Sequence, residues 1–164
     1  MMAAKVDSNS NICGDTGPMT VHFLGNLLTF HVRSAATGDK FTLIENRTAP
    51  GQGAPLHRQA DDEAFYVLEG QYEFFLDGDW HLKGAGEAVH IVPGTVHAFR
   101  NPGKTDARML IINSPGSHHE AFFVDVGDKA EFRQTAFPPI APPDIPAIVA
   151  SGLRNHIEIL PPAA

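Results

Sequence analysis

The sequence has little cysteine, few basic residues and no long apolar run. Its 164 residues include one cysteine, Cys13, so no internal disulfide forms and nothing requires an oxidising compartment. Lys and Arg number 12 against 19 Asp and Glu, which gives a formal charge of −7. This balance argues against a nucleic acid or a membrane surface as partner, because both bind basic proteins. No stretch of 18 apolar residues predicts a membrane span, so we expect a cytoplasmic protein.

Glycine and proline are abundant instead, with 15 and 13 residues, and they favour a turn-rich β fold. From Met19 to Ser114 the chain is a series of short apolar runs separated by Gly, Pro, Asp or Asn, which is typical of strands. Asp77-Gly78 lies between two such runs and predicts a hairpin. No long helical pattern interrupts this block. We therefore predict an all-β, antiparallel barrel or sandwich.

The pattern changes after Ser114. Residues 118–132 predict a short helix, and residues 138–146 form a proline-rich, extended connector. Asp144 is the predicted N-cap of a second short helix that Gly152 ends, and residues 156–160 predict an edge strand. The expected organisation is one domain, made of a flexible N-terminal arm, a barrel and a C-terminal extension that packs on the barrel, at residues 1–17, 18–116 and 117–164.

One group of polar residues has the composition of a metal site. His57 and Gln59 are two residues apart, so both side chains point to one face of an extended strand. Glu63 begins the next apolar run, and His97 follows 34 residues later, after a turn. Two imidazoles and one carboxylate suit Fe(II), and they also suit Mn, Zn, Ni or Co. Arg58 points the other way and is expected to pair with Asp61 or Asp62.

The remaining histidines are expected to be surface or hydrogen-bonded residues; these are His22, His31, His81, His118, His119 and His156. We interpret His118-His119 as an exposed helix start. His90 stays open, because strand alternation allows it to face outward or to supply a further ligand.

The spacing of the candidate ligands resembles the two motifs of the cupin superfamily. The first motif is matched at Gly51, His57, Gln59, Glu63 and Gly70, with Gln59 where the family has a second His. The second motif is matched at Gly86, Pro93, Gly94, His97 and Asn101, with Val92 at the usual proline position. Residues 19–162 further resemble small single-domain cupins of the quercetin 2,3-dioxygenase-like type.

This resemblance implies a jelly-roll β-barrel, a homodimer and a divalent metal ion held by three His and one Glu. Carried over to this sequence, His57, Glu63 and His97 would be ligands and Gln59 would take the fourth position. An amide oxygen is a weaker, harder donor than imidazole, so Gln59 weakens the metal site without abolishing it.

Three functions fit these residues. The first is a metal-dependent dioxygenase for a small aromatic or enolic substrate, with Glu63 as ligand and general base. The second is a binding module for a small molecule, with or without metal. The third is another metal-assisted reaction, such as isomerisation or decarboxylation.

Overall fold

The structure is a computed structural model that describes residues 17–162. The predicted N-terminal arm therefore lies outside the described residues, except for Gly17. The elements, in chain order, are β1 (Met19–Phe23), β2 (Asn26–Val32), the 3-10 helix η1 (Ser34–Thr37), β3 (Thr42–Thr48), β4 (Gly53–Gln59), β5 (Asp62–Glu69), β6 (Gln71–Leu76), β7 (Asp79–Gly84), β8 (Ala88–Ile91), β9 (His97–Arg100), β10 (Ala107–Ser114), α1 (Ser117–Val126), β11 (Asp128–Ala130), α2 (Ile145–Arg154) and β12 (Ile157–Ile159).

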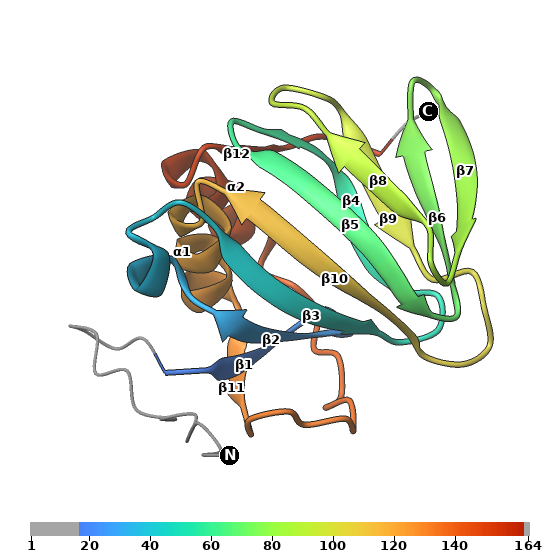
Figure 1. Cartoon of the computed structure of the whole chain (residues 1–164), viewed down its shortest axis with the longest axis horizontal. Helices are drawn as coiled ribbons and strands as arrows, with labels where there is room; N and C mark the ends of the chain where they lie inside the picture. Colours follow the sequence, from blue (N-terminus) through green and yellow to red (C-terminus); the bar gives the residue numbers. More distant parts are fainter. Residues whose placement is uncertain (1–16, 163–164) are drawn as a thin grey trace, which may run out of the picture.

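Two antiparallel sheets face each other and enclose the core (Figure 1). One has the strand order β11-β1-β2-β3-β10-β5-β8, and the other has the order β12-β4-β9-β6-β7. Alternation along the strands sends apolar side chains inward. These include Phe30, Ile44, Phe65, Tyr72, Phe74 and Met109, each at most 2% exposed. The predicted all-β jelly-roll with short C-terminal helices is confirmed.

The predicted hairpin is also confirmed, between β6 and β7. Asp77 and Gly78 have φ angles of 52° and 90°, the left-handed region that a two-residue hairpin turn needs. The strands on either side pair in register from Gln71 opposite Gly84 to Leu76 opposite Asp79.

Strand β4 brings two candidate ligands together. It pairs with β9 so that His57 lies opposite His97. Gly53, at the start of β4, makes this approach feasible, because a Cβ there would lie 2.0 Å from the carbonyl oxygen of Phe99. Along β4, His57 and Gln59 are buried and Arg58 is exposed, as the two-residue period predicts.

The C-terminal segment covers one end of the barrel with two helices, which lie beside each other in Figure 1. Helix α1 is shorter than the predicted helix 118–132. A Cβ at Gly127 would lie 2.2 Å from Cγ1 of Val21, and the chain continues from Gly127 as β11, which pairs with β1. Asp144 caps α2 as predicted, since its Oδ1 accepts a hydrogen bond from the Ala147 N–H at 3.1 Å. Gly152 lies inside α2 instead of ending it.

The last strand, β12, pairs with β4 at the edge of the second sheet, which confirms the predicted edge strand. Phe122 of α1, Ile148 of α2 and Ile157 of β12 form a small apolar cluster of their own. This cluster attaches the C-terminal segment to the barrel by burial of apolar surface.

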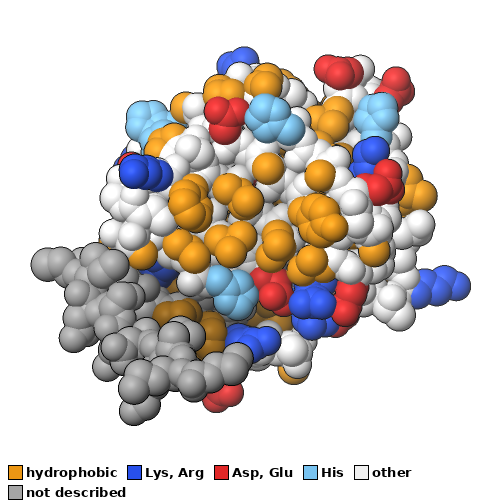
Figure 2. Space-filling view, in the orientation of Figure 1, with side chains coloured by type: hydrophobic (Ala, Val, Ile, Leu, Met, Phe, Trp, Pro, Cys, Tyr) orange, Lys and Arg blue, Asp and Glu red, His pale blue; other side chains and the backbone are white. Residues whose placement is uncertain are grey.

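The outer side of the seven-stranded sheet is rich in apolar side chains (Figure 2). Tyr66 of β5 and Ile112 of β10 are 46% and 42% exposed there. This face offers surface for the second copy that the resemblance implies, although the homodimer stays a prediction. Among residues 17–162, no helix is long and apolar enough to span a membrane.

Candidate metal centre

Glu63 is the middle of a buried polar cluster between the two sheets. Its side chain, on β5, is 4% exposed. Oε2 accepts a hydrogen bond from Nε2 of Gln59 at 2.7 Å, and Nε2 of His97 lies 3.1 Å from the same oxygen. Oε1 accepts one from Nδ2 of Asn113 at 3.0 Å. A carboxylate this deeply buried needs positively charged or strongly donating partners, and it has them on both oxygens.

His57 and His97 face Glu63 from the opposite sheet. Their rings lie 4.2 Å apart between centroids. Nδ1 of His57 is 2.7 Å from the Pro55 carbonyl oxygen, and Nδ1 of His97 is 2.8 Å from the Thr95 carbonyl oxygen. Because each Nδ1 must donate to its carbonyl, the proton of the neutral ring resides on Nδ1 and the Nε2 lone pair is free.

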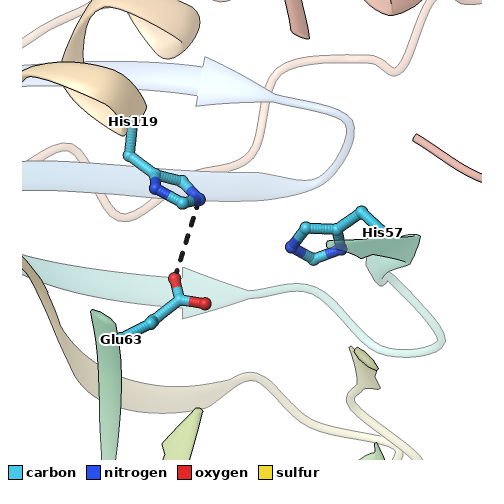
Figure 3. Close-up of side chains that lie close together, drawn as sticks. All are labelled: His57, Glu63 and His119. Carbon is cyan, nitrogen blue, oxygen red and sulfur yellow. Dashed lines mark ion pairs between the residues drawn. The ribbon is translucent and has the colours of Figure 1, made fainter. Parts of the chain in front are cut away.

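A third imidazole, that of His119, enters the cluster from α1. Its Nδ1 lies 2.8 Å from Oδ2 of Asp61, and its Nε2 lies 3.8 Å from Oε1 of Glu63. His57, Glu63 and His119 each offer a ligand atom, and these atoms lie within 4.8 Å of one another (Figure 3). The prediction that His119 belongs to an exposed helix start is therefore wrong, since it is 4% exposed.

Gln59 lies in the cluster through its amide nitrogen. Nε2 donates to Glu63, and reversing the amide would place two oxygens against each other, so the orientation is determined. Among the described residues, its Oε1 has no hydrogen-bond partner. Gln59 thus orients Glu63 in this arrangement, and its role as a metal ligand stays a prediction.

Asp61 is a member of the site that sequence reasoning missed. It is fully buried, and its Oδ2 accepts hydrogen bonds from Asn113 at 3.1 Å and from His119. The predicted pairing of Asp61 or Asp62 with Arg58 is wrong, because Arg58 bonds to Glu158 at 2.6 Å. A charged residue in the turn between two strands gives no sign of burial by itself.

His90 lies outside the cluster. It is exposed on β8, and its Nε2 is 3.0 Å from Oδ1 of Asp62. Alternation along β8 sends Val89 and Ile91 inward and His90 outward. The further imidazole near Glu63 comes from His119 of α1, the helix that follows β10.

The members of the cluster differ in the direction of their pKa shifts. Burial alone would raise the pKa of the Glu63 carboxyl, but His119, His97 and His57 together hold it well below its usual range. Burial and the neighbouring His97 lower the pKa of His57 to about 4. Burial also opposes a charge on His119, yet Glu63 and Asp61 outweigh it and raise the pKa of that imidazole.

The donor set fits a divalent cation. With neutral imidazoles, Glu63 and Asp61 leave a buried charge of −2, and the Nε2 lone pairs of His57, His97 and His119 point toward the Glu63 carboxylate. Nε2 of His97 lies 3.1 Å from Oε2 of Glu63, and Nε2 of His119 lies 3.8 Å from Oε1. Because imidazole lone pairs and carboxylate oxygens repel one another, a positively charged species between or beside them would stabilise this arrangement. Imidazole nitrogen and carboxylate oxygen are the donors that Fe(II), Mn, Zn, Ni and Co accept.

A cavity of about 400 Å³ lies against this cluster. His57, Glu63 and His119 line part of it, and most of the wall is apolar, including Phe65, Ile111 and Phe123. Part of that wall belongs to the C-terminal segment, through Ile145, Ile148 and Val149 of α2 and Ile157 and Ile159 of β12. The site therefore suits a small, mainly apolar ligand whose polar group meets the cluster.

Comparison with known proteins agrees with this fold. Residues 46–113 match the family model described as Cupin domain. The chain is 30% identical over 84 residues to an uncharacterized protein of Methanocaldococcus jannaschii, covering 51% of this chain and 67% of that protein. It is also 31% identical over 90 residues to the mannose-1-phosphate guanylyltransferase of Escherichia coli (strain K12), covering 53% of this chain. The chain spans only 18% of that enzyme's length.

Solved structures show the same fold at low identity. A predicted oxalate decarboxylase from Thermotoga maritima has a TM-score of 0.54 at 20% identity, with 61% of this chain and 93% of that chain covered. KdgF from Halomonas sp. has a TM-score of 0.52 at 17% identity, covering 58% and 84%. An RmlC-like cupin from Shewanella frigidimarina has a TM-score of 0.51 at 16% identity, covering 66% and 93%.

The two facing sheets and the buried His and Glu cluster define a cupin barrel with a candidate metal site. The chain belongs to the cupin superfamily, with its Cupin domain at residues 46–113. His119, α2 and β12 lie outside the matched residues. The narrower resemblance to quercetin 2,3-dioxygenase-like cupins stays a prediction.

Proposed function

We propose that this protein is a metal-dependent dioxygenase that acts on a small, mainly apolar substrate with an enolic or phenolic hydroxyl. The observation that carries the proposal is the convergence of three imidazole Nε2 atoms on a buried glutamate beside a mainly apolar cavity. O2 is the oxidant, and both of its atoms enter the product while the substrate supplies the electrons.

His57, Glu63 and His119 would hold the ion, together with His97, whose Nε2 contacts the same carboxylate. A divalent ion bound there supplies Lewis acidity, which favours the ionised form of the substrate hydroxyl. Glu63 stays ionised because its pKa is held low, so it contributes negative charge and is a weak proton acceptor. We therefore assign Glu63 mainly to holding the ion and only secondarily to general-base catalysis.

The other residues prepare the site. Gln59 donates to Oε2 of Glu63 and limits the rotation of the carboxylate. Asp61 accepts from Nδ1 of His119 and directs Nε2 of that ring at the cluster. The apolar wall excludes water, which strengthens electrostatic interactions with the substrate oxygen.

A second candidate, a metal-free binding module, is favoured by the raised pKa of His119. A proton on His119 would compensate part of the negative charge of the cluster without an ion. Such a cluster would bind an anionic ligand by hydrogen bonds from the imidazolium group.

Metal titration distinguishes the two candidates. Protein stripped with a chelator should bind about one equivalent of Fe(II), Mn, Ni, Co or Zn per chain at pH 7.5, measured by calorimetry. The affinity should fall at low pH, because the imidazoles must lose their protons to bind. Absence of binding for all of these ions would leave the metal-free module.

Oxygen consumption then tests the reaction. Protein loaded anaerobically with Fe(II) should consume O2 with 3-hydroxyflavone, a rigid aromatic enolone, and isotope from ¹⁸O2 should appear twice in the product. Metal binding without O2 consumption on enolic and phenolic compounds would overturn the dioxygenase and favour another metal-assisted reaction.

A further inference from the structure

A second cavity, also of about 400 Å³, lies between the proline-rich connector, the last turn of α1 and helix α2. We call it the connector cavity. It shares only Phe23, Leu24 and Ile148 with the cavity at Glu63, and no member of the Glu63 cluster lines it. Because the connector contributes several prolines with fixed φ angles, this wall is largely preformed.

His22, near the end of β1, lines the connector cavity and is 5% exposed. Its Nε2 accepts a hydrogen bond from the Gly25 N–H at 3.2 Å, and because a main-chain N–H only donates, Nε2 carries no proton. Burial lowers the pKa of this imidazole, which keeps the ring neutral near pH 7. The one proton of the neutral ring is therefore on Nδ1.

The Nδ1–H of His22 lacks an acceptor among the residues that the structure describes. Nor is Nδ1 one of the unpaired atoms that the protein encloses completely, such as Oδ1 of Asn46. It therefore keeps accessible surface, and because the ring lines the connector cavity, that surface faces a ligand bound there. Donors on side chains buried this deeply are normally satisfied, so a ligand acceptor is the missing partner.

Asp128 supplies negative charge next to this donor. It lies directly opposite His22 in the pairing of β11 with β1, so both side chains share one face of the sheet at about 5 Å between Cβ atoms. Its charge opposes the effect of burial on the pKa of His22, as a carboxylate near the ring should. Within residues 17–162, Asp128 forms no ion pair, whereas Asp125 is paired with Arg154 at 2.6 Å.

The charges around the connector cavity favour an organic cation. The carboxylates of Asp125, Asp128 and Asp144 line it, against one guanidinium, that of Arg154. A metal ion would need a nitrogen lone pair of His22, but Nε2 already accepts a hydrogen bond and Nδ1 is protonated. An organic cation that has its own acceptor satisfies both the carboxylate and the imidazole N–H.

We propose that the connector cavity binds a small organic cation with a carbonyl group next to its ammonium group, as in an α-amino amide. The carbonyl oxygen accepts the hydrogen bond from Nδ1 of His22, and the ammonium group pairs with Asp128. An aliphatic substituent packs against Ile140, which is 45% exposed, and against Ile148 of α2. This site is additional to the proposed dioxygenase centre, because none of the candidate metal ligands lines it.

Three matched compounds test the two polar contacts. L-Leucinamide has the ammonium group, the carbonyl and an aliphatic chain, whereas 3-methylbutylamine lacks the carboxamide and 4-methylpentanamide lacks the amine. NMR titrations use the full chain after chelator treatment, near pH 7, because an amino amide also coordinates metal ions. The wild-type protein should bind L-leucinamide roughly 10-fold more tightly than either truncated compound, as the loss of one polar contact predicts.

The ring nitrogens of His22 report the contact directly. In protein labelled with ¹⁵N-histidine, the His22 signals are those missing from His22→Phe, and they should show a protonated Nδ1 and an unprotonated Nε2. Saturating L-leucinamide or 4-methylpentanamide should shift the Nδ1 signal, and 3-methylbutylamine should leave it nearly unchanged. A proton on Nε2 instead, or an Nδ1 signal that no compound shifts, would overturn the assigned donor.

Asp128→Asn removes the negative charge with little change of shape. It should weaken binding of L-leucinamide about 3-fold, the size of an exposed ion pair, and leave 4-methylpentanamide unaffected. Glu131→Gln is the matched control, because Glu131 is an exposed acid nearby that does not line the cavity, and it should bind L-leucinamide as the wild-type protein does. Glu63→Gln should also bind it normally.

Equal affinity of the wild-type protein for the three compounds would overturn the proposed ligand class. An unchanged affinity in Asp128→Asn, or an equal loss in Glu131→Gln, would overturn the pairing with Asp128. Loss of L-leucinamide binding in Glu63→Gln would overturn the connector cavity as the site, since the ligand would then lie at the Glu63 cluster. Thermal unfolding of each variant confirms that it is folded.

Discussion

Residues 46–113 and residues 117–162 build one centre by different means. The first segment, which matches the family model, brings His57, Glu63 and His97 together by strand pairing. The second adds His119 from a helix and closes the cavity with α2 and β12. The barrel thus provides three of the candidate metal-binding side chains. The C-terminal segment adds the fourth and forms part of the cavity wall, which limits the molecules that fit.

The largest expected effect lies in the barrel segment. Glu63→Gln removes the carboxylate on which the imidazoles converge, so affinity for Zn²⁺ should fall more than 100-fold, beyond the ~10–100-fold typical of changes next to a ligand. Calorimetry on chelator-treated protein measures this. Glu158→Gln, which breaks only the exposed pair with Arg58, is the control and should bind Zn²⁺ normally. An unchanged affinity in Glu63→Gln would place the ion elsewhere.

The pH dependence of the unfolding free energy distinguishes the two segments, because the pKa of His57 in the barrel is lowered and that of His119 in the C-terminal segment is raised. The folded state keeps His57 neutral down to about pH 4, whereas the unfolded chain gains its proton near 6.5. The unfolding free energy should therefore fall by about 3 kcal/mol from this group as pH falls from 6.5 to 4. His119 acts oppositely, since its raised pKa stabilises the fold below pH 6.5 and that contribution is lost as pH rises through the folded pKa.

Urea unfolding of metal-free protein between pH 4 and 8 measures both effects. His57→Gln should show a smaller loss of stability than the wild-type protein between pH 6.5 and 4. Parallel curves for the two proteins would mean that His57 is not held neutral by the fold.

His119→Ala tests the contribution of the C-terminal segment directly. Loss of this imidazole should weaken Zn²⁺ binding by at least roughly 10–100-fold, the range seen when a group beside a metal is removed. His118→Ala is the neighbouring control and should have a smaller effect, because His118 contacts Asp61 only at 3.5 Å. Equal Zn²⁺ affinity in His119→Ala and the wild-type protein would mean that the C-terminal segment lines the cavity but contributes no metal ligand.

Gln59→His restores the usual barrel ligand. If residue 59 reaches the ion, affinity for Ni²⁺ should rise by about 10-fold, since imidazole is a better donor than an amide to this metal. The double variant Gln59→His with His119→Ala should then recover part of the binding lost in His119→Ala. No gain in either protein would mean that Gln59 serves only to orient Glu63.

The smallest expected effect is in α2. Asp144→Ala removes the cap at the start of the helix and should lower the unfolding free energy by about 1 kcal/mol. Proteolysis should then cut the segment 138–146 faster than in the wild-type protein, with the barrel intact. No change in either measurement would show that packing alone fixes α2.

The sequence predicted the parts of the fold and of this centre that depend on local spacing. His57 and Gln59 share a face because side chains alternate along a strand, and the Asp77-Gly78 hairpin follows from its turn residues. His119 and Asp61 escaped prediction because their burial depends on where α1 docks, which no local pattern encodes. A histidine shortly after β10, in a chain that lacks one usual ligand, was the available signal.

The three imidazole rings are oriented by different hydrogen-bond acceptors at Nδ1, and these acceptors differ in how readily a point substitution can remove them. His57 and His97 are oriented by main-chain carbonyls, which remain whatever side chain stands at positions 55 and 95. His119 is oriented by the carboxylate of Asp61, which one base change can remove. Variation among proteins of this kind should therefore leave two rings in place and redirect the third, so that a new coordination sphere can arise without rebuilding the barrel.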